Sequence, residues 1–176
     1  DTNDVLSLME YSQKNSVPLL ARGGGSSQCG QTVGESVVLD YSKHQNKILE
    51  LNVEEKYVWV QPGVVLDHLN DYLKPHGLWF PVDVSTSSRA TIGGMSANNS
   101  CGSRSLYYGN MVHNVLAIEA ILDDGSIFQF DQINKNYLAT KNNQDRLYKI
   151  IDKFIHVRHK VGCLLYTSPS PRDVVP

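Results

Sequence analysis

Three consecutive glycines, Gly23, Gly24 and Gly25, constrain the fold of this chain more than any other feature of its sequence. They follow a short apolar run, 17–22, which has the length and composition of a β-strand. Glycine adopts backbone conformations with positive φ that other residues avoid, so the run indicates a sharply folded loop. A second strand-like run follows at 36–40. The sequence therefore predicts a strand, a glycine-rich loop and another strand.

The loop departs from both well-known glycine motifs for phosphate binding. A P-loop pattern that starts at Gly25 and reaches Gly30 requires a lysine next, but Gln31 occupies that position. The dinucleotide fingerprint starts correctly at Gly23 and Gly25 and then fails at Gln28. Both motifs also place a helix after the loop, whereas this loop leads into a strand. The pattern therefore disfavours nucleotide hydrolysis and an anion site built on a helix dipole.

Two interpretations of the loop remain. In the first, successive backbone N–H groups of 23–27 form a nest around a diphosphate, with Arg22 and the hydroxyls of Ser26 and Ser27 nearby. In the second, the glycines are a hinge that binds nothing. A second segment rich in small residues, 91–102, favours the first interpretation. Two places where the backbone must approach something closely suit one extended ligand that touches both.

The rest of the chain mixes short strands with a few helices. Three segments have apolar residues at helical spacing, and two pairs of strand-like runs are separated by turn residues, as in hairpins. This mixture predicts an α+β fold. The expected helices are 3–14, 64–73 and 147–157, with a short helix from Thr91; the expected hairpins are 48–61 and 115–130; 78–82 is extended, and Trp59 and Trp79 lie in strands of the core.

Composition narrows the class of protein. The chain has 176 residues, 41% of them hydrophobic and 19% charged, which suits one globular core. With 16 basic and 18 acidic residues and no long run of one sign, the net charge is −2, which argues against nucleic acid as a partner. Apolar runs fall short of the roughly 18 residues of a transmembrane helix. The cysteines Cys29, Cys101 and Cys163 form no Cys-x-x-Cys pair, so this chain alone supplies no iron–sulfur site.

Several short runs, taken together and in order, resemble a known family. These runs are 17–27, 37–40, 60–64, 73–78, 85–94 and 108–109. They resemble the FAD-binding domain of the vanillyl-alcohol-oxidase type, also called PCMH-type. The nearest likeness is to FAD-linked D-lactate, glycolate and D-2-hydroxyacid dehydrogenases, in the branch fused to a C-terminal iron–sulfur domain. The resemblance covers about residues 3–162.

The resemblance implies a two-lobed α+β fold with FAD between the lobes. The residues that would hold the FAD diphosphate are Arg22, Gly23, Gly24, Gly25, Ser26 and Ser27. Those that would line the rest of the cofactor are Ser88, Arg89, Thr91, Gly93, Gly94, Asn99 and Gly102, with Ile118 near the adenine or flavin. Some relatives bond a histidine of the first loop to the flavin. Residues 22–35 contain no histidine, so non-covalent FAD is expected.

The resemblance also implies a reaction. The flavin would accept a hydride from a D-2-hydroxy acid of the D-lactate or glycolate class, giving the 2-oxo acid, and a quinone, a cytochrome or an electron-transfer flavoprotein would reoxidise it. The catalytic base and any metal would come from a downstream substrate domain, and an iron–sulfur cluster from the C-terminal part of the parent protein. No catalytic residue is therefore assigned here. The alternative is a non-redox module that binds a phosphorylated nucleotide.

A few other side chains carry chemistry that this function does not need. His156 and His159 lie three apart on a helix without a third ligand, so no metal site is expected. Cys101 is expected to be a small packed residue, not a flavin linkage. His113 precedes the strand expected near the cofactor, and Arg104 is the loop cation that could meet a substrate carboxylate, a phosphate or solvent.

The C-terminal segment 163–176 matches nothing in the family. It resembles a translated sequencing adaptor, so we expect a non-native tail without function; the other interpretation is a genuine Ser/Pro linker. Residues 1–162 are then expected to be an N-terminally truncated FAD-binding domain.

Overall fold

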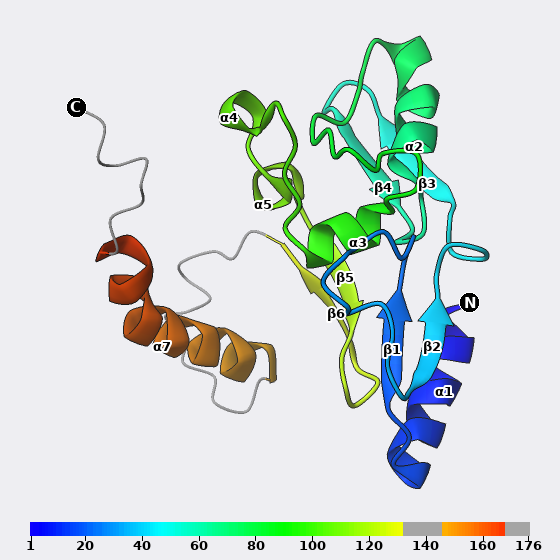
Figure 1. The fold of residues 1–176 in the computed structure, drawn as a ribbon, viewed down its shortest axis with the longest axis vertical. Coiled ribbons are helices and arrows are strands. Elements are labelled where there is room, and N and C mark those ends of the chain that lie inside the picture. Colours follow the sequence, from blue (N-terminus) through cyan, green and yellow to red (C-terminus); the bar gives the residue numbers. More distant parts are fainter. Residues whose placement is uncertain (132–145, 168–176) are drawn as a thin grey trace. The chain divides into compact units, whose positions relative to one another are not determined.

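The computed structural model describes residues 1–131 and 146–167, with side chains described as far as Val157 (Figure 1). The chain divides into two compact units, Asp1–Gln129 and Phe130–Pro176, and each is treated by itself. In the first unit short helices and two-stranded sheets are mixed along the chain, which is an α+β architecture.

The first helix, α1 (Thr2–Asn15), has well-defined ends. Asp1 is its N-cap and accepts a hydrogen bond from the Asp4 backbone N–H at 3.1 Å. Ser16 ends the helix in the left-handed conformation with φ of 54°. The helix was predicted from apolar residues at helical spacing, and the prediction is confirmed.

The strands on either side of the glycine loop pair in parallel. β1 (Leu19–Arg22) and β2 (Val37–Asp40) run in register from Leu19 opposite Val37 to Arg22 opposite Asp40. A parallel pair needs a connection of a dozen or more residues, because the chain must return to the level at which it started. Residues 23–36 are that connection, so the predicted order of strand, loop and strand is confirmed.

A hairpin and a helix form the next packed element. β3 (Ile48–Asn52) and β4 (Tyr57–Val60) pair antiparallel, and α2 (Leu66–Leu73) continues into a 3-10 turn, η1 (Lys74–His76). One face of α2 packs on the hairpin. The residues of this apolar cluster are Val64, Leu69 and Leu73, with Ile48, Leu51, Val58, Val60 and Leu78 against them.

The segment after α2 differs from the prediction. Residues 78–84 form no strand in the described structure, and Trp79 is 41% exposed, so its assignment to a strand of the core is wrong. Phe80 packs against the core and Val82 is fully buried. Successive side chains of an extended chain point to opposite sides, so Trp79, next to Phe80, faces outward. Trp79 instead contacts the ring of Tyr108 edge-on, with centroids 5.2 Å apart. Trp59, in β4, is half-buried.

Three short helices come next along the chain, and a second core cluster lies in this region. They are α3 (Ile92–Ala97), α4 (Ser105–Tyr108) and α5 (Met111–Asn114). Thr91 is the N-cap of α3, as expected from the sequence. The buried residues of this cluster join α3 and α5 to α2, and none of them belongs to α4; they are Leu66, Val82, Ala90, Met95 and Met111.

The described chain ends with a hairpin and a long helix. β5 (Ile118–Ile121) and β6 (Ile127–Phe130) pair through a turn in which Gly125 has φ of 80°, which confirms the predicted hairpin. In the second unit, α7 (Arg146–Thr167) confirms the helix predicted over 147–157 and continues past residue 162. The side chains of His159 and Cys163 lie outside the described residues. Among the described helices, none is long and apolar enough to cross a membrane.

Candidate functional site

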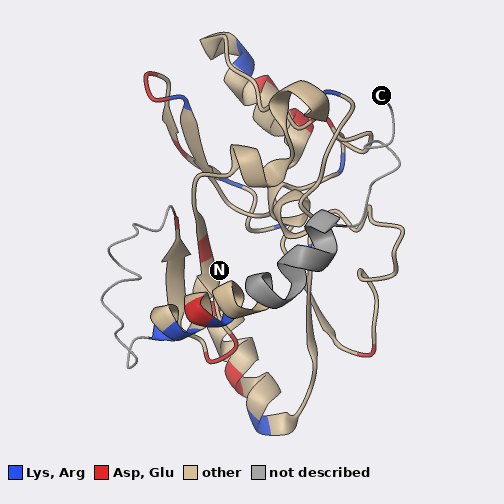
Figure 2. Cartoon of the chain, turned by 90° about the vertical axis from the view of Figure 1, so that its left-hand side faces the viewer, with Lys and Arg blue, Asp and Glu red and all other residues tan. Residues whose placement is uncertain are grey.

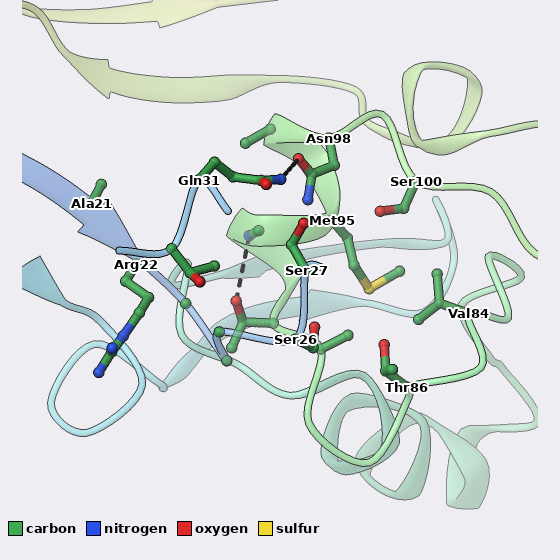
Figure 3. Close-up of a pocket in the computed structure, with 18 residues that line it drawn as sticks. Ala21, Arg22, Ser26, Ser27, Gln31, Val84, Thr86, Met95, Asn98 and Ser100 are labelled. Carbon is green, nitrogen blue, oxygen red and sulfur yellow. Dashed lines mark hydrogen bonds between the residues drawn. The ribbon is translucent and has the colours of Figure 1, made fainter. Parts of the chain in front are cut away.

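A hollow with a cavity volume of about 140 Å³ lies where the glycine loop meets α3 (Figure 3). Pockets for drug-sized ligands occupy roughly 300–1,000 Å³, so this hollow suits one part of a large ligand. Its lining is built from the end of β1, the loop, the segment before α3 and α3 itself. The lining residues are Ala21, Arg22, Gly23, Gly24, Gly25, Ser26, Ser27, Gln31, Thr32, Val84, Thr86, Ala90, Thr91, Gly94, Met95, Ala97, Asn98 and Ser100.

The first two glycines let the loop lie directly against the segment before α3. A Cβ on Gly23 would collide with Oγ1 of Thr91, which is only 2% exposed. A Cβ on Gly24 would collide with the backbone carbonyl of Arg89. The absence of side chains here is therefore required by the contact of the chain with itself, and that contact sets the shape of the loop.

The loop also leaves a row of hydrogen-bond donors unused. Gly25 has φ of 63°, in the left-handed region. Among the described residues, the backbone N–H groups of Gly23 to Ser27 find no protein acceptor. Unused N–H groups in succession around such a turn form an anion-binding concavity. The hydroxyls of Ser26 and Ser27 line the same hollow.

The charged side chain at the hollow, Arg22, forms an ion pair at the end of the parallel strands. Arg22 Nη2 lies 3.1 Å from Oδ2 of Asp40, its register partner on β2. Hydrogen bonds from the Ser42 hydroxyl and the Ser42 N–H, and then from Arg22, lower the pKa of Asp40 from 3.8 to about 2. Of the described residues that line the hollow, Arg22 is the one with a charged side chain. Elsewhere in the described chain basic and acidic residues are interspersed (Figure 2).

Arg22 points away from the opposite wall of the hollow. In Figure 3 its side chain extends to the side away from Thr86 and Ser100. The hydroxyls of Ser26 and Ser27 are therefore among the uncharged polar groups of the lining. The side chains of Val84 and Met95 supply an apolar part of the wall.

The structure brings together part of the predicted site. The predicted residues in the lining are Arg22, Gly23, Gly24, Gly25, Ser26, Ser27, Thr91 and Gly94; those outside it are Ser88, Arg89, Gly93, Asn99, Gly102 and Ile118.

Several of the residues outside the lining have contacts within the protein. Gly93 lies against Pro62, where an added Cβ would sit 2.5 Å from Cβ of Pro62. Gly102 lies directly on Asp83. The Asn99 side chain accepts a hydrogen bond from the Val112 N–H at 3.0 Å and so ties this segment to α5.

Sequence reasoning missed several polar residues of the lining. These are Gln31, Thr32, Thr86, Asn98 and Ser100. Each stands within a few residues of a predicted glycine or serine, so proximity to the glycine segments was the available signal. Whether each of these residues lines the hollow depends on the path of the loop along α3, and that path is seen only in the three-dimensional structure.

Three other side chains singled out in the sequence are placed by the fold. Arg104 is paired: its Nε lies 3.5 Å from Oδ2 of Asp83 and its guanidinium lies over the Trp79 ring at 5.0 Å. Hydrogen bonds from the Ser103 hydroxyl and the Arg104 N–H lower the pKa of Asp83. Cys101 is exposed, so the expectation that it is packed is wrong.

His113 also has a local partner. Its Nδ1 accepts a hydrogen bond from the Asn110 N–H at 3.1 Å, within the cap of α5. Among the described residues, no group of three or more His, Cys, Asp or Glu side chains is placed to hold a metal ion.

The unused backbone donors of a glycine loop in an α+β domain are typical of a protein class with an anion site. Residues 1–131 match the family model described as "FAD binding domain", and the chain belongs to this family. The PCMH-type resemblance and its α+β fold are thereby confirmed.

Relatives and solved structures agree with this assignment. D-2-hydroxyglutarate dehydrogenase of Haemophilus influenzae is 43% identical over 173 residues, which cover 94% of this chain and 17% of that protein. The mitochondrial D-lactate dehydrogenase (cytochrome) of Kluyveromyces lactis is 40% identical over 72% of this chain and 22% of its own length. The crystal structure of 6-hydroxy-D-nicotine oxidase from Arthrobacter nicotinovorans matches with a TM-score of 0.68 at 18% identity, over 78% of this chain and 30% of that one. This chain therefore spans less than a third of each of these proteins.

Proposed function

We propose that the full-length protein is an FAD-dependent oxidoreductase that oxidises a D-2-hydroxy acid to the corresponding 2-oxo acid, and that this chain forms most of its FAD-binding domain. The observation that carries the proposal is the row of unused N–H donors on the glycine loop of a chain that belongs to the FAD-binding family. The named activities of the relatives, D-2-hydroxyglutarate and D-lactate dehydrogenase, support the substrate class.

The residues present fit the diphosphate of FAD. A diphosphate needs several hydrogen-bond donors and no carboxylate facing it, and of the described lining residues none is acidic. The backbone N–H groups of 23–27 and the hydroxyls of Ser26 and Ser27 would hold the phosphate oxygens. Arg22 would contribute its charge from the rim, where Asp40 orients it.

The remaining parts of FAD need more surface than this hollow offers. Its volume of about 140 Å³ suits a diphosphate with adjoining groups, not the whole dinucleotide. We assign the predicted residues outside the lining to that surface as a proposal: Ser88, Arg89, Gly93, Asn99, Gly102 and Ile118. Thr91 and Gly94, which line the hollow, would adjoin the diphosphate.

The binding is proposed to be non-covalent. The loop that lies on the hollow contains no histidine between residues 22 and 35, so the side chain that some relatives use for a flavin bond is missing. Denaturing the purified full-length protein in acid tests this directly: all of the yellow colour should appear in the supernatant, and colour that stays with the pellet contradicts non-covalent binding.

When bound, FAD supplies the hydride-accepting chemistry. This chain binds and orients the cofactor: the loop amides fix the diphosphate and the contact with Arg89 and Thr91 keeps the loop in place. The proton acceptor and any metal ion for the hydroxy acid belong to parts of the protein outside this chain. An iron–sulfur cluster there, and a quinone, a cytochrome or an electron-transfer flavoprotein as electron acceptor, are part of the proposal.

The test is to purify the full-length protein and assay it with three acids, D-lactate, glycolate and D-2-hydroxyglutarate, each with an artificial electron acceptor. We expect flavin absorbance bands that survive desalting and that bleach when one of these acids is added without acceptor. Protein that carries FAD but bleaches with none of the three would refute the substrate class. Colourless protein that retains another nucleotide would refute the redox function altogether.

A further inference from the structure

The glycine loop touches the rest of the site at two separate places. Near its beginning, Gly23 and Gly24 lie on Thr91 and Arg89, at the N-terminal end of α3. Near its other end, Nε2 of Gln31 donates a hydrogen bond to Oδ1 of Asn98 at 3.3 Å (Figure 3). Asn98 is the residue that ends α3, so the loop follows this helix from one end to the other.

The two contacts differ in kind. The first is a close packing of backbone against backbone at Arg89 and against the buried Thr91. The second is a single bond between two exposed amide side chains. The backbone of Asn98 is fixed to α3, because its N–H donates to the carbonyls of Gly94 and Ser96. Gln31 lies in the loop, outside any helix or strand. The second contact is therefore the one that can open and close.

The unused donors lie on the stretch that begins at the first contact and leads toward the second. The N–H groups of 23–27 can bind one anion together only while the loop keeps its curvature. Gly25 and Gly30, both with positive φ, give this stretch a large conformational entropy when it is free. A loop that is already ordered loses less entropy when it binds, and so binds more tightly.

We propose that the Gln31–Asn98 hydrogen bond is a latch that holds the glycine loop in its anion-binding shape and so slows the loss of the dinucleotide. Both residues act as positioning residues through the loop. The inference rests on the proposed function, since it takes FAD as the ligand.

The test is a double-mutant cycle on the full-length protein. Gln31→Ala, Asn98→Ala and the double variant are compared with the unaltered protein for the FAD dissociation constant and the FAD dissociation rate, both read from flavin fluorescence. Gln28→Ala is the matched control, because Gln28 is an exposed glutamine of the same loop that lines no part of the hollow. The thermal midpoint of each apoprotein reports whether the fold itself has changed.

We expect each single variant to raise the dissociation constant and the dissociation rate roughly 2- to 10-fold, which is the range for one hydrogen bond. The double variant should be no worse than the weaker-binding single variant, because the two changes remove the same bond. Gln28→Ala should match the unaltered protein, and the thermal midpoints should agree.

Three results overturn the latch. Single variants that bind FAD as well as Gln28→Ala does show that the bond has no role. Effects that multiply in the double variant show that the two amides act separately, and tighter binding after either change shows that the bond obstructs the site. A protein that binds no FAD in any form refutes the proposed function instead, so the two failures are distinguishable.

Discussion

The contact between Gly23 and Thr91 allows a quantitative test of how the loop is shaped. An alanine Cβ at position 23 would lie on Thr91 Oγ1, in a site where the threonine is only 2% exposed. Adding a methyl group to such a packed site costs roughly 1–3 kcal/mol. The obstacle is a side-chain atom, so Thr91→Ala removes most of it; the Cβ of residue 91 would remain, 3.3 Å away.

Removing the hydroxyl has its own cost, because Oγ1 of Thr91 accepts a hydrogen bond from the Gly94 N–H at 3.3 Å and caps α3. Loss of such a cap costs about 1 kcal/mol. We expect Gly23→Ala to lower the free energy of unfolding by roughly 1–3 kcal/mol. The double variant should lie close to Thr91→Ala alone, well short of the sum of the two single effects.

Gly24→Ala is the matched control. Its Cβ would meet the carbonyl oxygen of Arg89, a backbone atom that no substitution removes, so Thr91→Ala should bring no relief and the two effects should add. The assay is urea unfolding of the full-length protein, monitored by far-ultraviolet circular dichroism. The unfolding transition that shifts in the Gly24→Ala variant is assigned to this domain. Additive effects of Gly23→Ala and Thr91→Ala, or a Gly23→Ala protein of unchanged stability, would refute the packing argument.

Three further predictions concern the loop, the ion pair and the exposed cysteine. Gly25→Ala should cost roughly 1–2 kcal/mol in the same urea assay, since φ is 63°, and Gly25→Asn should cost less. The pKa of Asp40 is depressed from 3.8 to about 2, so its stabilising contribution should be complete above pH 3.8 and be lost as the pH falls toward 2. Thermal midpoints measured across this pH range should fall accordingly, and the Asp40→Asn variant should lack this part of the pH dependence. Cys101→Ser should leave FAD content and acid release unchanged; flavin that loses a covalent attachment in this variant would contradict non-covalent binding.

The local elements of the fold follow from local patterns. Helix α1 was predictable because its cap, its apolar spacing and its end are all contained in 1–16. The turn at Gly125 and the hairpin around it were predictable for the same reason. Trp79 was misplaced because the burial of this segment depends on tertiary contacts: Val82 shares a core cluster with residues of α2, α3 and α5, and Trp79 contacts Tyr108 of α4.

The glycines show the same division at the site. From the sequence, the two glycine segments were expected to let the backbone approach a ligand; at Gly23, Gly24, Gly93 and Gly102 the backbone lies close to the chain itself. The sequence did not show what is approached: for these four glycines it is Thr91, Arg89, Pro62 and Asp83 of the chain itself. A requirement for glycine is local information, whereas the identity of the neighbour is set by tertiary packing.

The docking of the loop on the start of α3 has a consequence for synthesis on the ribosome. The N-terminal half of the site leaves the ribosome first, yet Gly23 and Gly24 gain their packing partners only when Arg89 and Thr91 follow. Contacts between segments far apart in sequence form late, since a long loop must close first. A nascent chain that already contains β1 and β2 therefore lacks the surface on which the glycine loop packs, and FAD bound at the proposed site can assist folding only after α3 has been translated.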